Sequence, residues 1–146
     1  MSAIADFIRL PATAVEQLRS NFDQTLQRFG QPAASYQWSG YVLATLIAYL
    51  EEHGIELTKS PYNALTEELC QSRGAAIFIF TPAHKDTFMS RLSPDQFSAD
   101  ELRDYYNDFN ACNEPEMGQA MLDGIASIRD SLASLDADSV IVFSIG

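Results

Sequence analysis

The triplet His84-Lys85-Asp86 is where this chain could do chemistry most directly. It follows the apolar run 75–80, which predicts a buried strand, and strand ends are frequent ligand positions in sheets covered by helices. An imidazole titrates near neutral pH, so His84 could act as a general base oriented by Asp86 or another carboxylate. The alternative is a solvated histidine in a polar turn. His53 ends a predicted helix, where the helix dipole favours a structural role.

Signatures of the common cofactor and hydrolase sites are absent from the sequence. It contains no G-x-G-x-x-G, phosphate-binding loop, H-E-x-x-H, G-x-S-x-G or C-x-x-C motif. Cys70 and Cys112 lie too far apart for a metal or redox motif, and the two histidines do not have zinc-site spacing. We therefore expect buried free thiols in a reducing compartment and predict no cofactor and no metal.

Aromatic and acidic residues are interleaved along 102–116 (LRDYYNDFNACNEPE). Tyrosine offers a large contact area at low entropic cost, and carboxylates around it steer and orient a basic partner. Helical spacing places Leu102, Tyr106 and Phe109 on a stripe facing the core, with Tyr105 at the border of the acidic face. The alternative is an amphipathic helix with a solvated face. The residues predicted to contact a partner are Asp100, Glu101, Asp104, Tyr105, Asp108, Glu114 and Glu116.

Negative charge is concentrated in the last third of the chain. The net charge is −11. Residues 1–94 carry nine acids and seven bases, a net of −2, whereas residues 95–146 carry eleven acids and two bases, a net of −9. Such a field repels nucleic acid and anionic membranes and attracts basic partners. We expect these C-terminal carboxylates to form one continuous patch with an aromatic rim; the alternative is a surface charged for solubility.

The start of the chain shows no basic stretch followed by a long apolar run, which argues against a signal peptide. The most apolar segment, 41–50, is too short to cross a bilayer. We therefore expect a cytoplasmic protein with no membrane partner.

Hydrophobic periodicity predicts the elements that position these residues. Apolar runs and alternation predict strands at 2–10, 55–57, 75–80 and 138–146. Capping residues and helical spacing predict helices at 13–29, 40–53, 61–73, 84–92, 98–110 and 114–135. In the loop 31–38, Tyr36 and Trp38 either form a binding patch or fold back onto the core. The pattern predicts a single α+β domain over 1–146, with a small mixed sheet of about four strands covered by five to six helices.

The segment 92–107 (LSPDQFSADELRDYYN), followed by a long helix and a short terminal strand, resembles the C-terminal half of the YfbM-like family. These are small bacterial proteins of unknown function with an α+β fold. The resemblance covers about the last third of the chain and implies a small bacterial α+β protein. The family has no established catalytic residues, so it assigns none here.

The charge, the segment 102–116 and the missing enzyme motifs favour a non-enzymatic, acidic protein-binding module. Its predicted form is an immunity-type inhibitor that occludes a basic toxin or nuclease, present as a monomer or homodimer. One alternative is a small enzyme or ligand-binding domain that uses His84, Asp86 and the aromatic residues of the loop 36–38. Another is a structural protein that assembles through exposed apolar helix faces.

Overall fold

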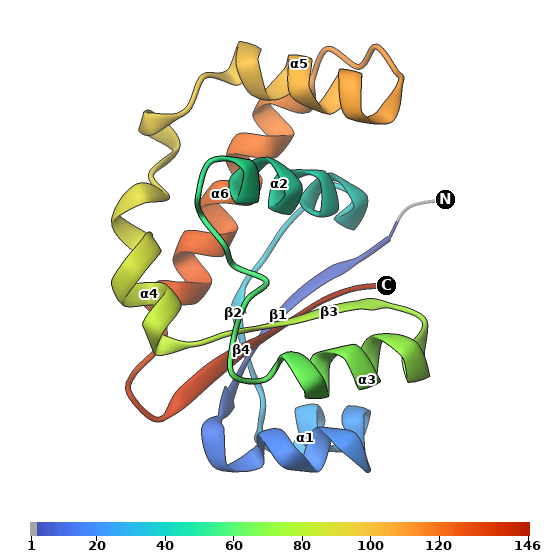
Figure 1. The fold of residues 1–146 in the computed structure, drawn as a ribbon, viewed down its shortest axis with the longest axis vertical. Coiled ribbons are helices and arrows are strands. Elements are labelled where there is room, and N and C mark those ends of the chain that lie inside the picture. Colours follow the sequence, from blue (N-terminus) through green and yellow to red (C-terminus); the bar gives the residue numbers. More distant parts are fainter. Residues whose placement is uncertain (1–2) are drawn as a thin grey trace.

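The computed structural model describes residues 3–146, which adopt the predicted α+β fold (Figure 1). This part of the chain forms four strands: β1 (Ala5–Pro11), β2 (Gln31–Ala34), β3 (Ala76–Phe80) and β4 (Ser139–Ile145). It also forms six α-helices: α1 (Phe22–Phe29), α2 (Gly40–Glu52), α3 (Asn63–Arg73), α4 (Pro82–Phe88), α5 (Ala99–Asn110) and α6 (Met117–Ala133). The 3₁₀ segments are η1 (Ala12–Arg19), η2 (Met89–Arg91) and η3 (Pro94–Gln96). Ser2, predicted to begin the first strand, lies outside the described residues.

The strands form one sheet in the order β2-β1-β4-β3. The first and last strands are neighbours at its centre, paired from Ala5 with Ile145 to Pro11 with Ser139. The prediction of a mixed sheet is wrong, because all three pairings are antiparallel. Alternation along a strand reports which face a side chain occupies, and it looks the same for either strand direction.

Two of the predicted strand and loop assignments are also wrong. Residues 55–57 lie in the irregular segment after α2, in which Ile55 and Leu57 are buried by tertiary packing and not by strand pairing. Residues 31–34, predicted as loop, form the edge strand β2, in which Pro32 lies opposite Ile8. An edge strand tolerates proline because only one side of its backbone must donate hydrogen bonds.

The predicted helix 13–29 is divided at Ser20 and Asn21 into η1 and α1. The apolar stripe continues across the break through Leu18 and Phe22, so periodicity alone did not reveal the interruption. The other five predicted helices are present, with boundaries shifted by a few residues.

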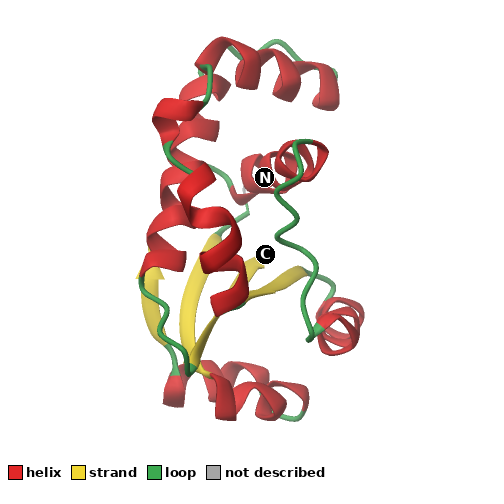
Figure 2. Cartoon of the chain, turned by 60° about the vertical axis from the view of Figure 1, so that its left-hand side comes forward, coloured by secondary structure: helices red, strands yellow, loops and turns green. Residues whose placement is uncertain are grey.

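Each face of the sheet carries its own hydrophobic core. On one face, Phe7 and Phe143 stack with ring centroids 4.7 Å apart and pack against α2 and α6. On the other face, Leu10 and Val142 pack against η1 and α3. Figure 2 shows the strands between these two helical layers. The upper layer in Figure 1, which contains α2, α5 and α6, holds most of the acidic and aromatic residues singled out above.

Two glycines of α6 let the neighbouring helices approach closely. A Cβ atom at Gly118 would lie 2.3 Å from the Ala99 carbonyl oxygen of α5. At Gly124 it would lie 2.7 Å from Leu43 and 2.8 Å from Leu46 of α2. At Gly118 the Ala99 backbone leaves no room for a side chain, whereas at Gly124 the leucine methyl groups would have to shift to make room. These two glycines therefore allow the close packing of α5 and α2 on α6. This long helix is therefore the element on which α5 and α2 of the upper layer pack.

The aromatic residues of the loop before α2 fold back onto α6. The Tyr36 hydroxyl donates a hydrogen bond to the Ala120 carbonyl oxygen at 2.8 Å, and Trp38 Nε1 donates to Asp123 Oδ2 at 2.8 Å. Burial raises the pKa of Tyr36, and the negative charge of Asp123 raises it further. These contacts match the core-packing alternative for the loop and leave no exposed aromatic patch there.

Candidate functional site

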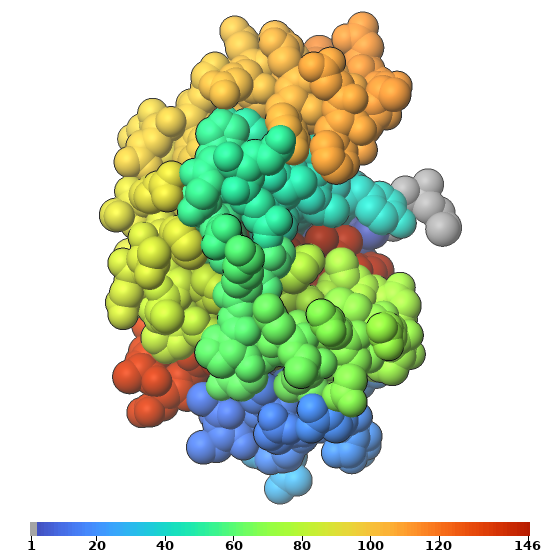
Figure 3. Space-filling model, in the orientation of Figure 1, coloured from blue at the N-terminus to red at the C-terminus, as the bar shows by residue number. Residues whose placement is uncertain are grey.

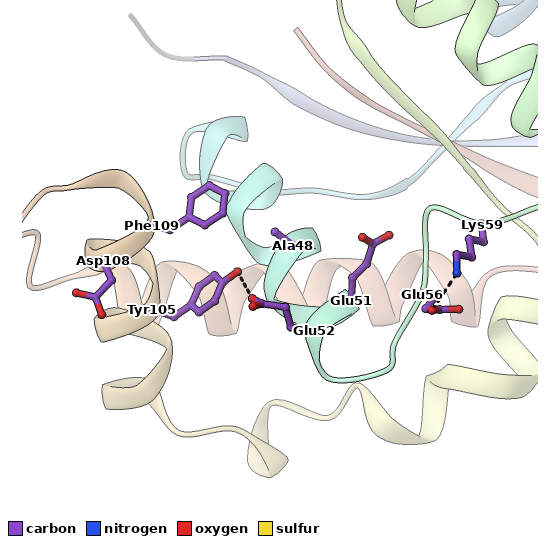
Figure 4. Close-up of a pocket in the computed structure, with 8 residues that line it drawn as sticks. All are labelled: Ala48, Glu51, Glu52, Glu56, Lys59, Tyr105, Asp108 and Phe109. Carbon is purple, nitrogen blue, oxygen red and sulfur yellow. Dashed lines mark hydrogen bonds and ion pairs between the residues drawn. The ribbon is translucent and has the colours of Figure 1, made fainter.

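The main candidate site is an open groove of about 790 Å³ between α2 and α5 (Figure 4). We call it the acidic groove. Its lining residues are Ala48, Glu51, Glu52, Glu56, Lys59, Tyr105, Asp108 and Phe109. The first five come from the end of α2 and the loop after it, and the last three come from α5. In the space-filling view, α5 (orange) lies beside α2 (teal) at one end of the molecule (Figure 3).

The wall formed by α2 supplies most of the negative charge. Leu46 and Leu50 are fully buried, which leaves Glu51 and Glu52 to project from the last turn. That turn contains no basic residue, so the two carboxylates add to the negative end of the helix dipole. The Thr58 hydroxyl donates to Glu51, which ties the following loop to the helix.

Lys59 is the only base among the lining residues. Its ammonium lies 3.1 Å from Glu56 and therefore offsets one carboxylate. Four carboxylates and one ammonium leave the acidic groove with an excess of negative charge. Both members of the Lys59–Glu56 pair are exposed, so the pair adds little to stability.

The wall formed by α5 supplies aromatic surface. The Tyr105 hydroxyl donates to Glu52 across the groove, and the Phe109 ring stacks on Tyr105 with centroids 5.8 Å apart. Burial raises the pKa of Tyr105 to about 12, with a further contribution from Glu52. Tyr105 therefore remains a neutral hydrogen-bond donor at physiological pH.

Phe109 corrects the sequence-based prediction for α5. Its spacing placed it with Leu102 on the stripe facing the core, but its side chain is 58% exposed whereas Leu102 is fully buried. Helical periodicity reports the direction of a side chain and not how far the neighbouring helix extends. At the C-terminal end of α5, the stripe faces the acidic groove.

A polar cluster behind the acidic groove joins α5 to α2. The Tyr49 hydroxyl donates to Glu101 Oε1 at 3.2 Å, and the Tyr49 ring stacks on His53 at 4.1 Å. His53 Nδ1 donates to the Tyr49 carbonyl oxygen at 2.8 Å, and His53 Nε2 lies 4.0 Å from Glu101. Burial first, and then Glu101, raises the pKa of Tyr49 to about 12. His53 thus has a structural position at the end of α2.

The structure brings only part of the predicted contact set together. Tyr105 and Asp108 line the acidic groove, and Glu101 belongs to the cluster behind it. Arg103 pairs with Asp100 at 3.2 Å and with Asp104 at 3.1 Å, so these two carboxylates are partly neutralised. Glu114 and Glu116 are exposed in the connection between α5 and α6 and do not line the acidic groove.

The acidic groove is therefore not built from the C-terminal third alone. Glu51, Glu52 and Glu56 come from the part of the chain with a net charge of only −2. The available signal was local, since these three acids lie within six residues and have one lysine beside them. A charge sum over 94 residues concealed it, because the bases that balance these acids lie elsewhere in the chain.

His84 is buried and not part of a polar turn as the alternative assumed. Nδ1 accepts from the Thr81 backbone N–H at 2.9 Å, so Nε2 carries the proton and donates to the Lys59 carbonyl oxygen at 2.7 Å. Burial lowers the pKa of His84 and keeps the ring neutral. Both nitrogens are thus engaged in the fold. Asp86 is exposed and makes no hydrogen bond to His84 within residues 3–146.

Over residues 3–146, no group of three or more histidine, cysteine, aspartate or glutamate side chains is arranged to hold a metal ion. Over the same residues, no helix combines the length and apolar character needed to cross a membrane. Comparison with protein-family models, curated proteins and solved structures finds no match to this chain.

Proposed function

We propose that this protein is a non-enzymatic binding module that captures a basic protein partner in the acidic groove. The observation that carries the proposal is the exposed Phe109 ring in a groove with excess carboxylates. An exposed aromatic ring supplies apolar surface that is buried from solvent when a partner binds, and the carboxylates favour a partner of opposite charge.

An inhibitor of a basic toxin or nuclease is the form of this function that the charge favours. A net charge of −11 accelerates encounter with a positively charged protein and repels the nucleic acid that a nuclease would bind. The module would act by occlusion, because carboxylates from α2 and α5 would occupy the basic surface that a substrate needs.

Capture from a lysate of the native host at low and high salt tests the proposal. We expect one dominant basic protein at low salt, released as the salt concentration rises, because screening weakens attraction between exposed charges. The captured protein, once purified, should bind the wild-type chain and bind Phe109→Ala more weakly. If no basic protein is retained at low salt, or if Phe109→Ala binds equally well, the proposal is wrong.

The hydrogen bonds of His84 argue against the alternative in which it acts as a general base. A general base needs a free ring nitrogen facing a substrate, and both nitrogens of His84 are hydrogen-bonded within the fold. Tyr36 and Trp38, which that alternative combined with His84, hydrogen-bond instead to α6.

A further inference from the structure

On the face of the sheet opposite the acidic groove, α1 and α3 show how this chain binds one of its own arginines. The guanidinium carbon of Arg73 lies 4.2 Å from the centroid of the Phe22 ring, and Arg73 Nη2 lies 3.0 Å from Asp23 Oδ1. An aromatic residue and the carboxylate next to it in sequence therefore hold one guanidinium, through its face and through its edge. This arrangement combines a cation–π contact with a charge-assisted hydrogen bond.

The acidic groove contains the same pair of residue types without the cation. Asp108 and Phe109 are adjacent in α5 and both line the groove. Within residues 3–146, no Lys, Arg or His nitrogen lies within 4.0 Å of the Asp108 carboxylate. Arg103, the base nearest to Asp108 in sequence, is already paired with Asp100 and Asp104. Lys59, the base that lines the groove, is already paired with Glu56.

We propose that the partner anchors itself with an arginine side chain, which stacks on Phe109 and places its guanidinium among the carboxylates of the acidic groove. This inference rests on the proposed function and names the chemistry of the partner. The glutamates of α2 and Asp108 of α5 supply the acceptors, and Phe109 supplies the exposed face. In Figure 4, Phe109 points toward α2, whereas the Asp108 carboxylate points away from α2 and lies at the margin of the groove.

Arginine fits this surface better than lysine for two reasons. The guanidinium is planar and weakly hydrated, so it stacks on an aromatic ring and still donates in its own plane to carboxylates. The lysine ammonium is compact and strongly hydrated, and it loses more solvation on approaching the Phe109 ring. The groove volume of about 790 Å³ also exceeds what one side chain fills, so a peptide segment around the arginine can enter.

Matched peptides test the preference. Acetyl-Gly-Arg-Gly-Arg-Gly-amide and acetyl-Gly-Lys-Gly-Lys-Gly-amide carry equal charge, and each is titrated into isotopically labelled protein at low salt while amide NMR shifts are followed. We expect both peptides to perturb residues of α2 and α5, with the arginine peptide binding about fivefold more tightly. We also expect the arginine δ-methylene protons to shift upfield because of the Phe109 ring current.

Two variants separate stacking from charge. Phe109→Leu keeps an apolar side chain of similar size but removes the π face, so the arginine preference should fall to less than twofold. Asp130→Asn removes one exposed carboxylate that does not line the groove, and it should leave the preference unchanged. Phe109 is exposed, so its replacement leaves the core intact, and a thermal melt verifies this.

The possible outcomes distinguish the inference from the proposed function. Equal affinity of the two peptides at the acidic groove overturns the arginine anchor and leaves capture of a basic partner in place. A preference that survives in Phe109→Leu also overturns the anchor. If neither peptide perturbs residues of the acidic groove, the proposed function is overturned as well.

Discussion

Two layers of the molecule both combine carboxylates with phenylalanine, but they differ in charge balance. One layer is formed by η1, α1 and α3, and the other by α2 and α5. In the first layer, Arg19 pairs with Glu16 and Glu68, and Arg73 pairs with Asp23 over the Phe22 ring. Two arginines meet three carboxylates there, so most of this negative charge is offset within the chain. In the second layer, the acidic groove keeps an excess of carboxylates beside an exposed phenylalanine. This difference is the basis of the proposal that the second layer binds a partner, whereas the first layer serves only the fold.

The largest predicted effect comes from removing one wall of the acidic groove. Gly118→Val places a branched side chain against the Ala99 backbone, which cannot yield as a flexible side chain would. We expect a loss of about 3 kcal/mol in the free energy of unfolding and a loss of partner binding. Urea unfolding and a binding titration measure both.

Ala133→Val at the exposed end of α6 is the control for placing valine in this helix. It should cost well under 1 kcal/mol. If Gly118→Val proves as stable as this control, the close approach of α5 and α6 does not position the groove.

The next effect concerns the loop that closes one end of the acidic groove. His84 donates to the Lys59 carbonyl oxygen, so His84→Gln should loosen this loop and cost about 2 kcal/mol. Amide hydrogen exchange should rise around Lys59 and stay unchanged in α3. Faster exchange across both layers would contradict the assignment of this contact to the groove.

The same histidine predicts a dependence on pH. Burial lowers the pKa of His84 in the folded state below its ordinary value of 6.5. As the pH falls through about 6.5, the unfolded chain binds a proton that the folded chain does not, so the stabilisation present above this pH is lost until the folded pKa is reached. Stability should therefore decline with acidification in the wild type and decline less in His84→Gln. Parallel pH profiles of the two proteins would contradict this account.

A smaller effect tests the layer formed by η1, α1 and α3. Arg73→Gln removes the cation that Asp23 and Phe22 share, and because the site is partly exposed we expect a cost of about 1 kcal/mol. Partner binding should not change. A substitution that is neutral for stability but weakens binding would reverse the roles assigned to the two layers.

The smallest effect is a gain. Glu51→Gln combined with Asp108→Asn reduces repulsion among carboxylates that the chain does not balance, so stability should rise by about 0.3 kcal/mol at low salt. The gain should vanish at high salt. Glu51→Gln keeps a side-chain oxygen that can accept from Thr58, so a loss of stability would mean that the negative charges themselves stabilise the fold.

The fold class was predictable because most of its helices are long and periodic. Ser98 caps the start of α5 by accepting from the Glu101 N–H, while the Glu101 carboxylate accepts from Tyr49 and does not complete a capping box. β2 was not predictable, since its four residues QPAA alternate in no recognisable way and gain strand geometry only by pairing with β1. Strand direction was equally invisible, because it depends on the path of the whole chain.

The candidate site was half predictable. Tyr105 and Asp108 were found because aromatic and acidic residues are interleaved within α5 itself. Glu51 and Glu52 were missed because they lie more than fifty residues earlier and meet α5 only in the folded structure. The exposure of Phe109 was missed for the same reason, since it depends on where the neighbouring helix ends.

The most direct test of the central claim compares two variants of equal net charge. Glu51→Gln with Asp108→Asn and Asp86→Asn with Asp130→Asn each remove two of the carboxylates that contribute to the net charge of −11, but only the first pair lines the acidic groove. The dissociation constant of each protein for the captured basic partner is measured at one fixed salt concentration. We predict at least about tenfold weaker binding for the first variant and little change for the second. Equal weakening in both would show that total charge, and not the groove, captures the partner.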